Sequence, residues 1–122
     1  MKWHFDNDAP IYTQLIRQIK AAIATGEFPP GEKLPSVRDL ATEAGVNPNT
    51  MQRAMTELER DGLVYSQRTS GRMVTEDSKI IEAAKVSLAQ GHIMSFVQAM
   101  KRLGFDRDEM IQLIVQGKDE EE

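Results

Sequence analysis

The sequence predicts a mainly α-helical fold with one small β-hairpin, followed by a separate module of two helices. Three observations support this fold class. Apolar residues recur at helical spacing before residue 61 and again after residue 77, and the turn Gly45–Asn47 separates two short helical patterns. Two strand-like runs then flank a polar, basic segment. Helix, tight turn, helix and hairpin in this order outline a winged helix-turn-helix domain.

The composition limits the class of protein. A chain of 122 residues suits one ordinary domain or a small domain with an appendage, and 40% hydrophobic residues suffice for a packed core. The absence of cysteine excludes a disulfide scaffold, a cysteine zinc site and a thiol nucleophile. No apolar run reaches the roughly 18–20 residues that span a bilayer, and the first residues lack the apolar segment of a signal peptide. We therefore expect a cytoplasmic protein with no membrane partner.

The charge distribution neither favours nor excludes a nucleic-acid partner. The net charge of −4 is unlike the basic balance typical of DNA-binding domains. Residues 33–72, however, hold six Lys and Arg against five Asp and Glu. Much of the remaining acidity lies in the tail Asp119–Glu122, which we interpret as a solvated end.

A first amphipathic helix is predicted between Pro10 and Gly26, because proline suits a first helical turn and glycine a C-cap. Its apolar stripe comprises Ile11, Leu15, Ile19 and Ile23. Ahead of it, Trp3 and Phe5 fall on one face of an extended segment. We expect these rings to cover the side of the domain, and a platform on which bases stack is the alternative.

The two central helices have clear start and stop signals. Ser36 and Asp39 have the spacing of a capping box, with aspartate in place of the usual Glu or Gln, and Gly45 closes this helix. Asn47 is a favoured N-cap and Pro48 a favoured first residue, so the next helix is predicted to begin there. The residues predicted to be buried are Val37, Leu40, Ala41, Met51, Ala54, Met55 and Leu58.

The polar side of the second central helix carries candidate DNA-binding residues. A recognition helix reads base edges with side chains of its first turns that donate and accept hydrogen bonds. The candidates of this kind are Asn47, Asn49, Thr50, Gln52 and Arg53. An ordinary solvated helix face would also be polar, but the preceding turn and the following hairpin favour DNA.

The strand-like runs Leu63–Tyr65 and Met73–Val74 predict a hairpin joined through residues 66–72. The candidates at or near its tip are Arg68, Ser70, Gly71 and Arg72. Basic and small residues there can approach phosphates or a minor groove. An exposed hairpin kept soluble by its charge is the alternative, but the position after the recognition helix favours a DNA-binding wing.

A domain boundary is expected near residue 76. The strand pattern ends there, and a new helical pattern begins after Asp77. We therefore expect a winged helix-turn-helix DNA-binding domain over residues 1–76 and a two-helix dimerisation module with an acidic tail over residues 77–122.

The C-terminal pattern predicts one long helix from Ile80 to Leu103, with a weak point at Gly91, and a final helix capped by Asp106. Two helices cannot bury so much apolar surface by themselves. They either fold back on the first domain or pair with another chain. We expect pairing through residues 77–117, because a two-fold homodimer matches a palindromic operator.

Three motifs together resemble the DNA-binding domain of GntR-family bacterial transcription regulators: GEFPPGEKLPSVRDLA, VNPNT and ELERDGLV. The resemblance covers residues 9–75, and the segment GFDRDEMIQLI in the tail is similar to the YtrA-like subfamily. It implies a homodimeric transcription regulator that binds double-stranded operator DNA, commonly as a repressor.

The resemblance also implies DNA contacts at individual positions. The matching contact positions on the helices are Ser36, Arg38, Asn49 and Thr50. Gly71 falls in the family's wing, which inserts towards the minor groove. Pro48 and Gln52 stand where many relatives have arginine, and Thr69 stands where the wing often has glycine.

Other classes of function are less well supported. His4 and His92 are far apart and lack metal-ligand spacing, and no glycine-rich phosphate loop is present, so we expect no enzyme, cofactor or metal site. A winged-helix module for protein contact or RNA binding is the main alternative. A small-molecule effector between the tail helices or at the domain junction is a third hypothesis, to which we prefer plain dimer packing.

Overall fold

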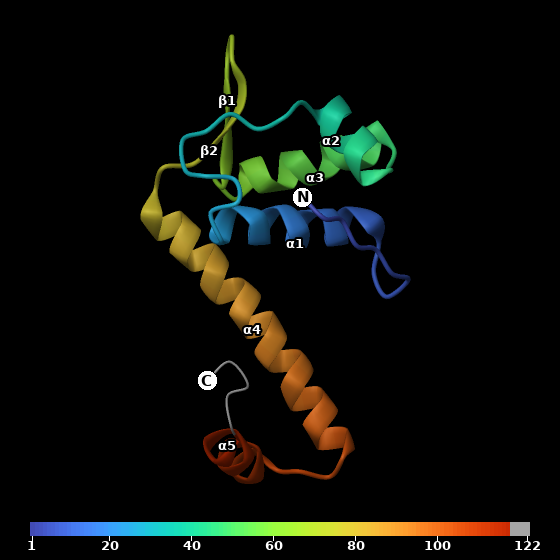
Figure 1. Cartoon of the computed structure of the whole chain (residues 1–122), viewed down its shortest axis with the longest axis vertical. Coiled ribbons are helices and arrows are strands. Elements are labelled where there is room, and N and C mark those ends of the chain that lie inside the picture. Colours follow the sequence, from blue (N-terminus) through green and yellow to red (C-terminus); the bar gives the residue numbers. More distant parts are fainter. Residues whose placement is uncertain (118–122) are drawn as a thin grey trace. The chain divides into compact units, whose positions relative to one another are not determined.

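The computed structural model describes residues 1–117, so the acidic tail Asp119–Glu122 lies outside the described residues. The chain divides into two compact units, of which the first comprises Met1–Val86 and the second begins at Ser87. The elements, labelled in Figure 1, are α1 (Ile11–Ala24), α2 (Val37–Ala44), α3 (Pro48–Arg60), β1 (Val64–Gln67), β2 (Gly71–Val74), α4 (Ser78–Arg102) and α5 (Arg107–Gln116). The fold is a mainly helical winged helix-turn-helix with C-terminal helices, as the sequence predicts.

The core of the first unit lies where α3 packs against α1 and α2 (Figure 1). The apolar side of α3 is fully buried, and it consists of Met51, Ala54, Met55 and Leu58. It meets the α1 stripe of Leu15, Ile19 and Ile23 and the α2 pair Leu40 and Ala41. Full burial stabilises each large apolar side chain by about 1.5–3 kcal/mol. The predicted inner faces of these helices are confirmed except at Ile11, which is exposed, and at Val37, which is only half-buried.

Local caps set the bounds of α2 and α3. The Ser36 hydroxyl accepts the Asp39 N–H at 3.0 Å, but no return bond from the Asp39 carboxylate forms, so only half of the predicted capping box is present. Gly45 ends α2 in the left-handed conformation, with φ of 72°. Asn47 then caps α3, and its Oδ1 accepts the Asn49 N–H at 2.7 Å. These bonds satisfy donors that a helix start leaves free.

The wing is a two-stranded antiparallel hairpin in which Val64 pairs with Val74 and Gln67 with Gly71. Its strands are longer than the sequence predicts, so the tip consists only of residues 68–70. The extra pairs join polar residues such as Ser66 and Arg72. Such pairs need no apolar alternation, because the ladder is held by backbone groups.

A third segment, which the sequence analysis missed, runs beside β2. Lys33 forms an antiparallel bridge with Met73. The Leu34 N–H donates to the Arg72 carbonyl at 2.9 Å, and the Val74 N–H donates to the Glu32 carbonyl at 2.8 Å. The connection between α1 and α2 is thereby tied to the wing.

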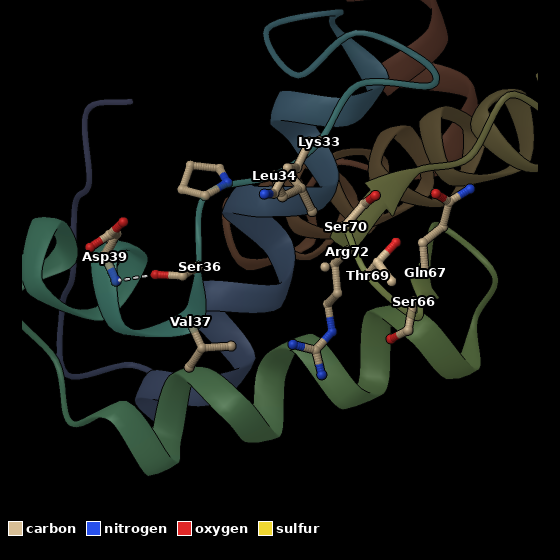
Figure 2. A pocket seen from close by; sticks show the side chains of 12 residues that line it. Lys33, Leu34, Ser36, Val37, Asp39, Ser66, Gln67, Thr69, Ser70 and Arg72 are labelled. Atoms are coloured by element: carbon tan, nitrogen blue, oxygen red, sulfur yellow. Dashed lines mark hydrogen bonds between the residues drawn. The ribbon is translucent and has the colours of Figure 1, made fainter.

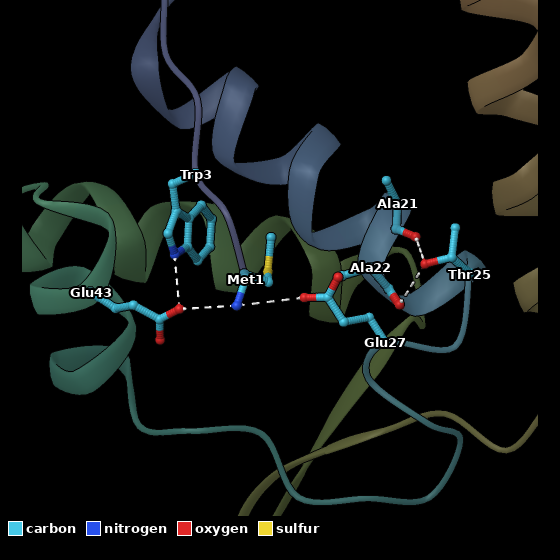
Figure 3. A network of polar contacts seen from close by, with 7 residues as sticks. All are labelled: Met1, Trp3, Ala21, Ala22, Thr25, Glu27 and Glu43. Atoms are coloured by element: carbon cyan, nitrogen blue, oxygen red, sulfur yellow. Dashed lines mark hydrogen bonds and ion pairs between the residues drawn. The ribbon is translucent and has the colours of Figure 1, made fainter.

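The N-terminal segment covers one side of the first unit. Trp3 and Phe5 stack with ring centroids 6.3 Å apart and pack against the core, which supports the covering role over a platform for bases. The Trp3 indole N–H donates to Glu43 at 3.2 Å, beside the Met1 amine (Figure 3). Gln14 is buried, and its side chain is satisfied by the backbone of Asp6 and Ala9.

Helix α4 contributes to both units. Its first turns place Ala84 in the core of the first unit and pack Ile80 and Ile81 against that core. The expected boundary near residue 76 marks the start of this helix at Ser78, whereas the compact unit continues to Val86. The helix runs without a break through Gly91, which the sequence marks as a weak point.

In the second unit, Asp106 and Glu109 form a complete capping box at the start of α5. The predicted N-cap at Asp106 is confirmed. Met110 is the buried apolar residue of this unit within the described range. No described helix has the length and apolar character needed to cross a membrane.

We expect Gly45→Ala to lower the free energy of unfolding by about 1–2 kcal/mol, because an L-residue is strained at positive φ. A Cβ at this position would meet nothing within 4 Å, so the loss reports backbone conformation alone. Gly45→Asn should cost less, because asparagine tolerates this conformation. Urea denaturation measures both, and equal losses for the two variants would contradict the explanation.

Candidate nucleic-acid interface

The exposed side of α3 is a continuous polar surface. Residues spaced by three or four positions share a helix face, and the face opposite the buried one consists of Asn49, Gln52, Arg53 and Thr56, all exposed. Thr56, which the sequence analysis did not select, accepts a hydrogen bond from the Gln52 amide at 3.3 Å and donates to the Gln52 carbonyl at 2.9 Å. Thr50 lies at the edge of this surface and is half-buried.

Arg53 is held by an aromatic ring. Its guanidinium carbon lies 3.6 Å from the centroid of the Tyr12 ring on α1. Stacking restrains the long side chain and leaves the N–H edges of the planar group free for phosphate or base oxygens. With Ile11, Asn49 and Thr50, the pair lines a shallow hollow of about 390 Å³. Tyr12 lies off the apolar stripe of α1, so no pattern in the sequence indicates this contact.

A groove of about 830 Å³ lies between the start of α2 and the wing (Figure 2). It brings together Ser36 with three of the predicted wing residues, Ser70, Gly71 and Arg72. Lys33, from the segment that pairs with β2, also lines it and was not among the predicted site residues. Arg38 is exposed on α2 but does not line the groove.

Gly71 has a backbone conformation that favours glycine, and Lys33 lies beside it at an ordinary contact distance. Its φ of 84° is in the left-handed region, and a Cβ there would lie 3.5 Å from Lys33 Cε. The aliphatic part of Lys33 therefore passes over the strand while its exposed amine adds positive charge beside the groove.

The position of Arg72 in the sequence suggests a free cation near the tip of the wing, but in the structure Arg72 is paired. Its Nε donates to Glu59 Oε1 of α3 at 3.1 Å, and only 22% of its side chain is exposed. The Ser66 hydroxyl donates to the same oxygen at 2.8 Å. Arg68, by contrast, is exposed at the tip and has no ion pair within the described range. Within the described range, the wing thus presents one exposed cation without an ion pair, Arg68, and one that is paired, Arg72.

Two predicted site residues already have structural roles. The oxygen acceptors of Ser36 and Asn47 cap α2 and α3, which leaves the serine O–H and the asparagine NH₂ as donors for a partner. Because phosphate oxygens accept hydrogen bonds, these residues suit contacts to a nucleic-acid backbone. His4 and His92 are both exposed, and the described residues include no group of His, Cys, Asp and Glu that could hold a metal ion.

Comparison with known proteins identifies a family. A model of the family described as "Bacterial regulatory proteins, gntR family" matches residues 11–74. The uncharacterized HTH-type transcriptional regulator YhcF of Bacillus subtilis is 40% identical over 108 residues, which cover 88% of this chain and 89% of YhcF. The HTH-type transcriptional repressor YtrA of the same organism is 39% identical over 100 residues, which cover 82% of this chain and 72% of YtrA.

Two solved structures extend the comparison. A GntR family transcriptional regulator from Listeria monocytogenes matches with a TM-score of 0.80 and 38% identity, over 93% of this chain and 100% of that chain. The DNA-binding domain of AraR in complex with operator ORX1 matches with a TM-score of 0.56 and 28% identity, over 62% of this chain and 96% of that chain.

We expect Asn47→Ala to lower the free energy of unfolding by about 1 kcal/mol, because α3 loses its N-cap. Asn49→Ala is the matched control on the same helix, since the Asn49 side chain makes no hydrogen bond within the described range. Its effect should stay within about 0.5 kcal/mol. Thermal or urea unfolding measures both variants, and a larger loss for Asn49→Ala would show that the roles of the two residues are misassigned.

Proposed function

The chain belongs to the GntR family of DNA-binding transcription regulators, and from this premise we propose that it is a homodimeric repressor of a palindromic operator. The family membership favours double-stranded DNA over the alternative of a protein-contact or RNA-binding module. The observation that carries the proposal is the exposed polar side of α3, which faces away from the core and has the groove and wing beside it.

We assign the exposed side of α3 to the major groove. Asn49, Thr50 and Gln52 lie in its first turns and have the donors and acceptors that read base edges. Arg53, stacked on Tyr12, is suited to a guanine edge or a phosphate. The match to the AraR DNA-binding domain in complex with an operator supports operator DNA as the partner by analogy.

We assign the residues around α3 to the DNA backbone and the minor groove. Ser36, Arg38 and Asn47 lie at the helix starts or are exposed on α2, where N–H and O–H donors meet phosphates. The proposed wing contacts are Arg68, Ser70, Gly71 and Arg72. Small and basic residues permit a close approach to a minor groove.

The second unit supports the proposed homodimer through residues 77–117. Its exposed large apolar residues are Ile93, Met94, Phe96, Leu103, Ile111, Leu113, Ile114 and Val115. The exposed fraction is 61% for Ile114 and 72% for Leu103. So many exposed large apolar side chains in a short segment favour an interface, and a two-fold pair presents two recognition helices to half-sites about one DNA turn apart.

Repression and location are the remaining parts of the proposal. YtrA, which is 39% identical to this chain, is described as a transcriptional repressor, and this supports repression over activation. A regulator of bacterial transcription acts where the chromosome lies, so we propose that the protein works in the cytoplasm.

We expect Arg38→Ala to raise the dissociation constant for operator DNA by about tenfold, and to reduce the slope of log affinity against log salt by about one, because one phosphate contact is lost. The probe is a duplex selected by the wild-type protein from a random pool. Arg17→Ala is the control, since Arg17 is an exposed arginine of α1 that lines neither the groove nor the hollow around Tyr12. Equal losses of affinity for the two variants would show that Arg38 is not part of the interface.

We expect Ile114→Asp to convert the dimer to monomers at micromolar concentration, because it puts a charge on the proposed apolar contact. Sedimentation equilibrium measures the mass, and affinity for the full palindrome should fall while affinity for a single half-site changes little. Gln112→Asp is the control, since it adds the same charge at an exposed polar position of α5. A dimer that survives Ile114→Asp would place the contact elsewhere.

A further inference from the structure

We propose that Glu59 is a positioning residue of the DNA interface, which fixes the wing to the recognition helix and orients Arg72 towards the groove. The proposal rests on the function proposed above and assigns a role to an acidic residue that electrostatics alone would exclude from a DNA-binding surface. Glu59 lies in the last turn of α3 and is one of the five acidic residues counted in residues 33–72.

One oxygen of Glu59 accepts hydrogen bonds from both strands of the wing. Ser66 of β1 and Arg72 of β2 are directly opposed in the hairpin register. Their side chains reach the same Glu59 oxygen, from Ser66 Oγ at 2.8 Å and from Arg72 Nε at 3.1 Å. Because a single acceptor holds a cross-strand pair, the contact fixes the direction of the whole hairpin relative to α3.

The contact also leaves Arg72 able to bind DNA. Its pairing with Glu59 uses Nε alone, so the terminal Nη1 and Nη2 groups have no partner within the described range. Arg72 lines the groove that Ser36 and Lys33 also line (Figure 2). A guanidinium that is already anchored at one nitrogen loses less side-chain entropy on binding a phosphate or a base edge than an unanchored one does.

The charge of Glu59 and its positioning role have opposite effects on binding. Non-specific DNA binding is electrostatic, so an acid beside the interface weakens it. Specific binding requires the helix and the wing to meet their grooves together, so a fixed wing strengthens it. Removing the charge should therefore raise or preserve affinity for non-specific DNA but lower affinity for the selected sequence, so that discrimination between sequences is reduced.

The test compares Glu59→Gln with wild type on two duplexes at one salt concentration, a duplex selected from a random pool by the wild-type protein and a scrambled version of it. We expect the ratio of their affinities to fall about five- to tenfold, with affinity for the scrambled duplex unchanged or up to about twofold tighter. Glutamine can still accept the Ser66 hydroxyl, so we expect the thermal unfolding midpoint to stay close to that of wild type, but its neutral oxygen holds the Arg72 guanidinium less strongly than a carboxylate does.

Glu57→Gln is the matched control. Glu57 is on the same helix and pairs with Arg60 at 2.7 Å, but it has no bond to the wing within the described range. Its loss removes the same charge and should shift both duplexes equally, which leaves the ratio unchanged. If Glu59→Gln behaves in the same way, Glu59 acts only by repulsion and the positioning role is wrong.

A double-mutant cycle with Arg72→Gln tests whether Glu59 acts through Arg72. We expect Glu59→Gln to change the ratio by less than about twofold in the Arg72→Gln background, because the side chain that it orients is gone. A full further loss there would overturn the proposed route. A wild-type protein that binds no duplex at low salt would instead overturn the proposed function, and this outcome is visible before any variant is made.

Discussion

The burial of one side of α3 is the constraint on which the interface depends. Met51, Ala54, Met55 and Leu58 fix the rotation of this helix against α1 and α2, because their combined apolar surface can be removed from water in one orientation only. The helical period then puts Asn49, Gln52, Arg53 and Thr56 on the opposite side. The recognition surface is therefore set by the core, and no polar contact has to define it.

Several candidate site residues are restrained before any partner binds. The Tyr12 ring restrains Arg53, Glu59 restrains Arg72, and the caps restrain Ser36 and Asn47. Each contact reduces the number of conformations that binding must eliminate, which is the physical basis of preorganisation. The individual bonds are weak at such exposure, so they orient the side chains more than they stabilise the fold. A surface with net negative charge overall can in this way still present well-placed cations.

The parts of the fold that depend on neighbouring residues could be predicted from the sequence. The Asn47 cap and the Gly45 turn join residues a few positions apart, so short motifs specify them. The buried face of α3 follows from periodicity. The wing ends were predicted less well, because Ser66 and Arg72 pair through the backbone without an apolar alternation that would mark a strand.

The remaining features depend on residues that are distant in the chain. The bridge between Lys33 and Met73 joins segments that are distant in the chain, and Lys33 carries no strand signal of its own. The pairing of Glu59 with Arg72 is likewise a tertiary contact, invisible to any count of charges. At Gly91 the intrinsic cost of glycine does not interrupt the helix, which runs from Ser78 to Arg102.

The backbone bonds between residues 31–34 and β2 affect how the wing tolerates change. Gly31, Leu34 and Val74 each donate a peptide N–H to a carbonyl across this junction, so attachment there requires no particular side chain. Substitutions at the tip, residues 68–70, can therefore change the chemistry of the wing without detaching the hairpin, because the bonds that attach β2 to residues 31–34 are made by backbone groups and not by the side chains of the tip.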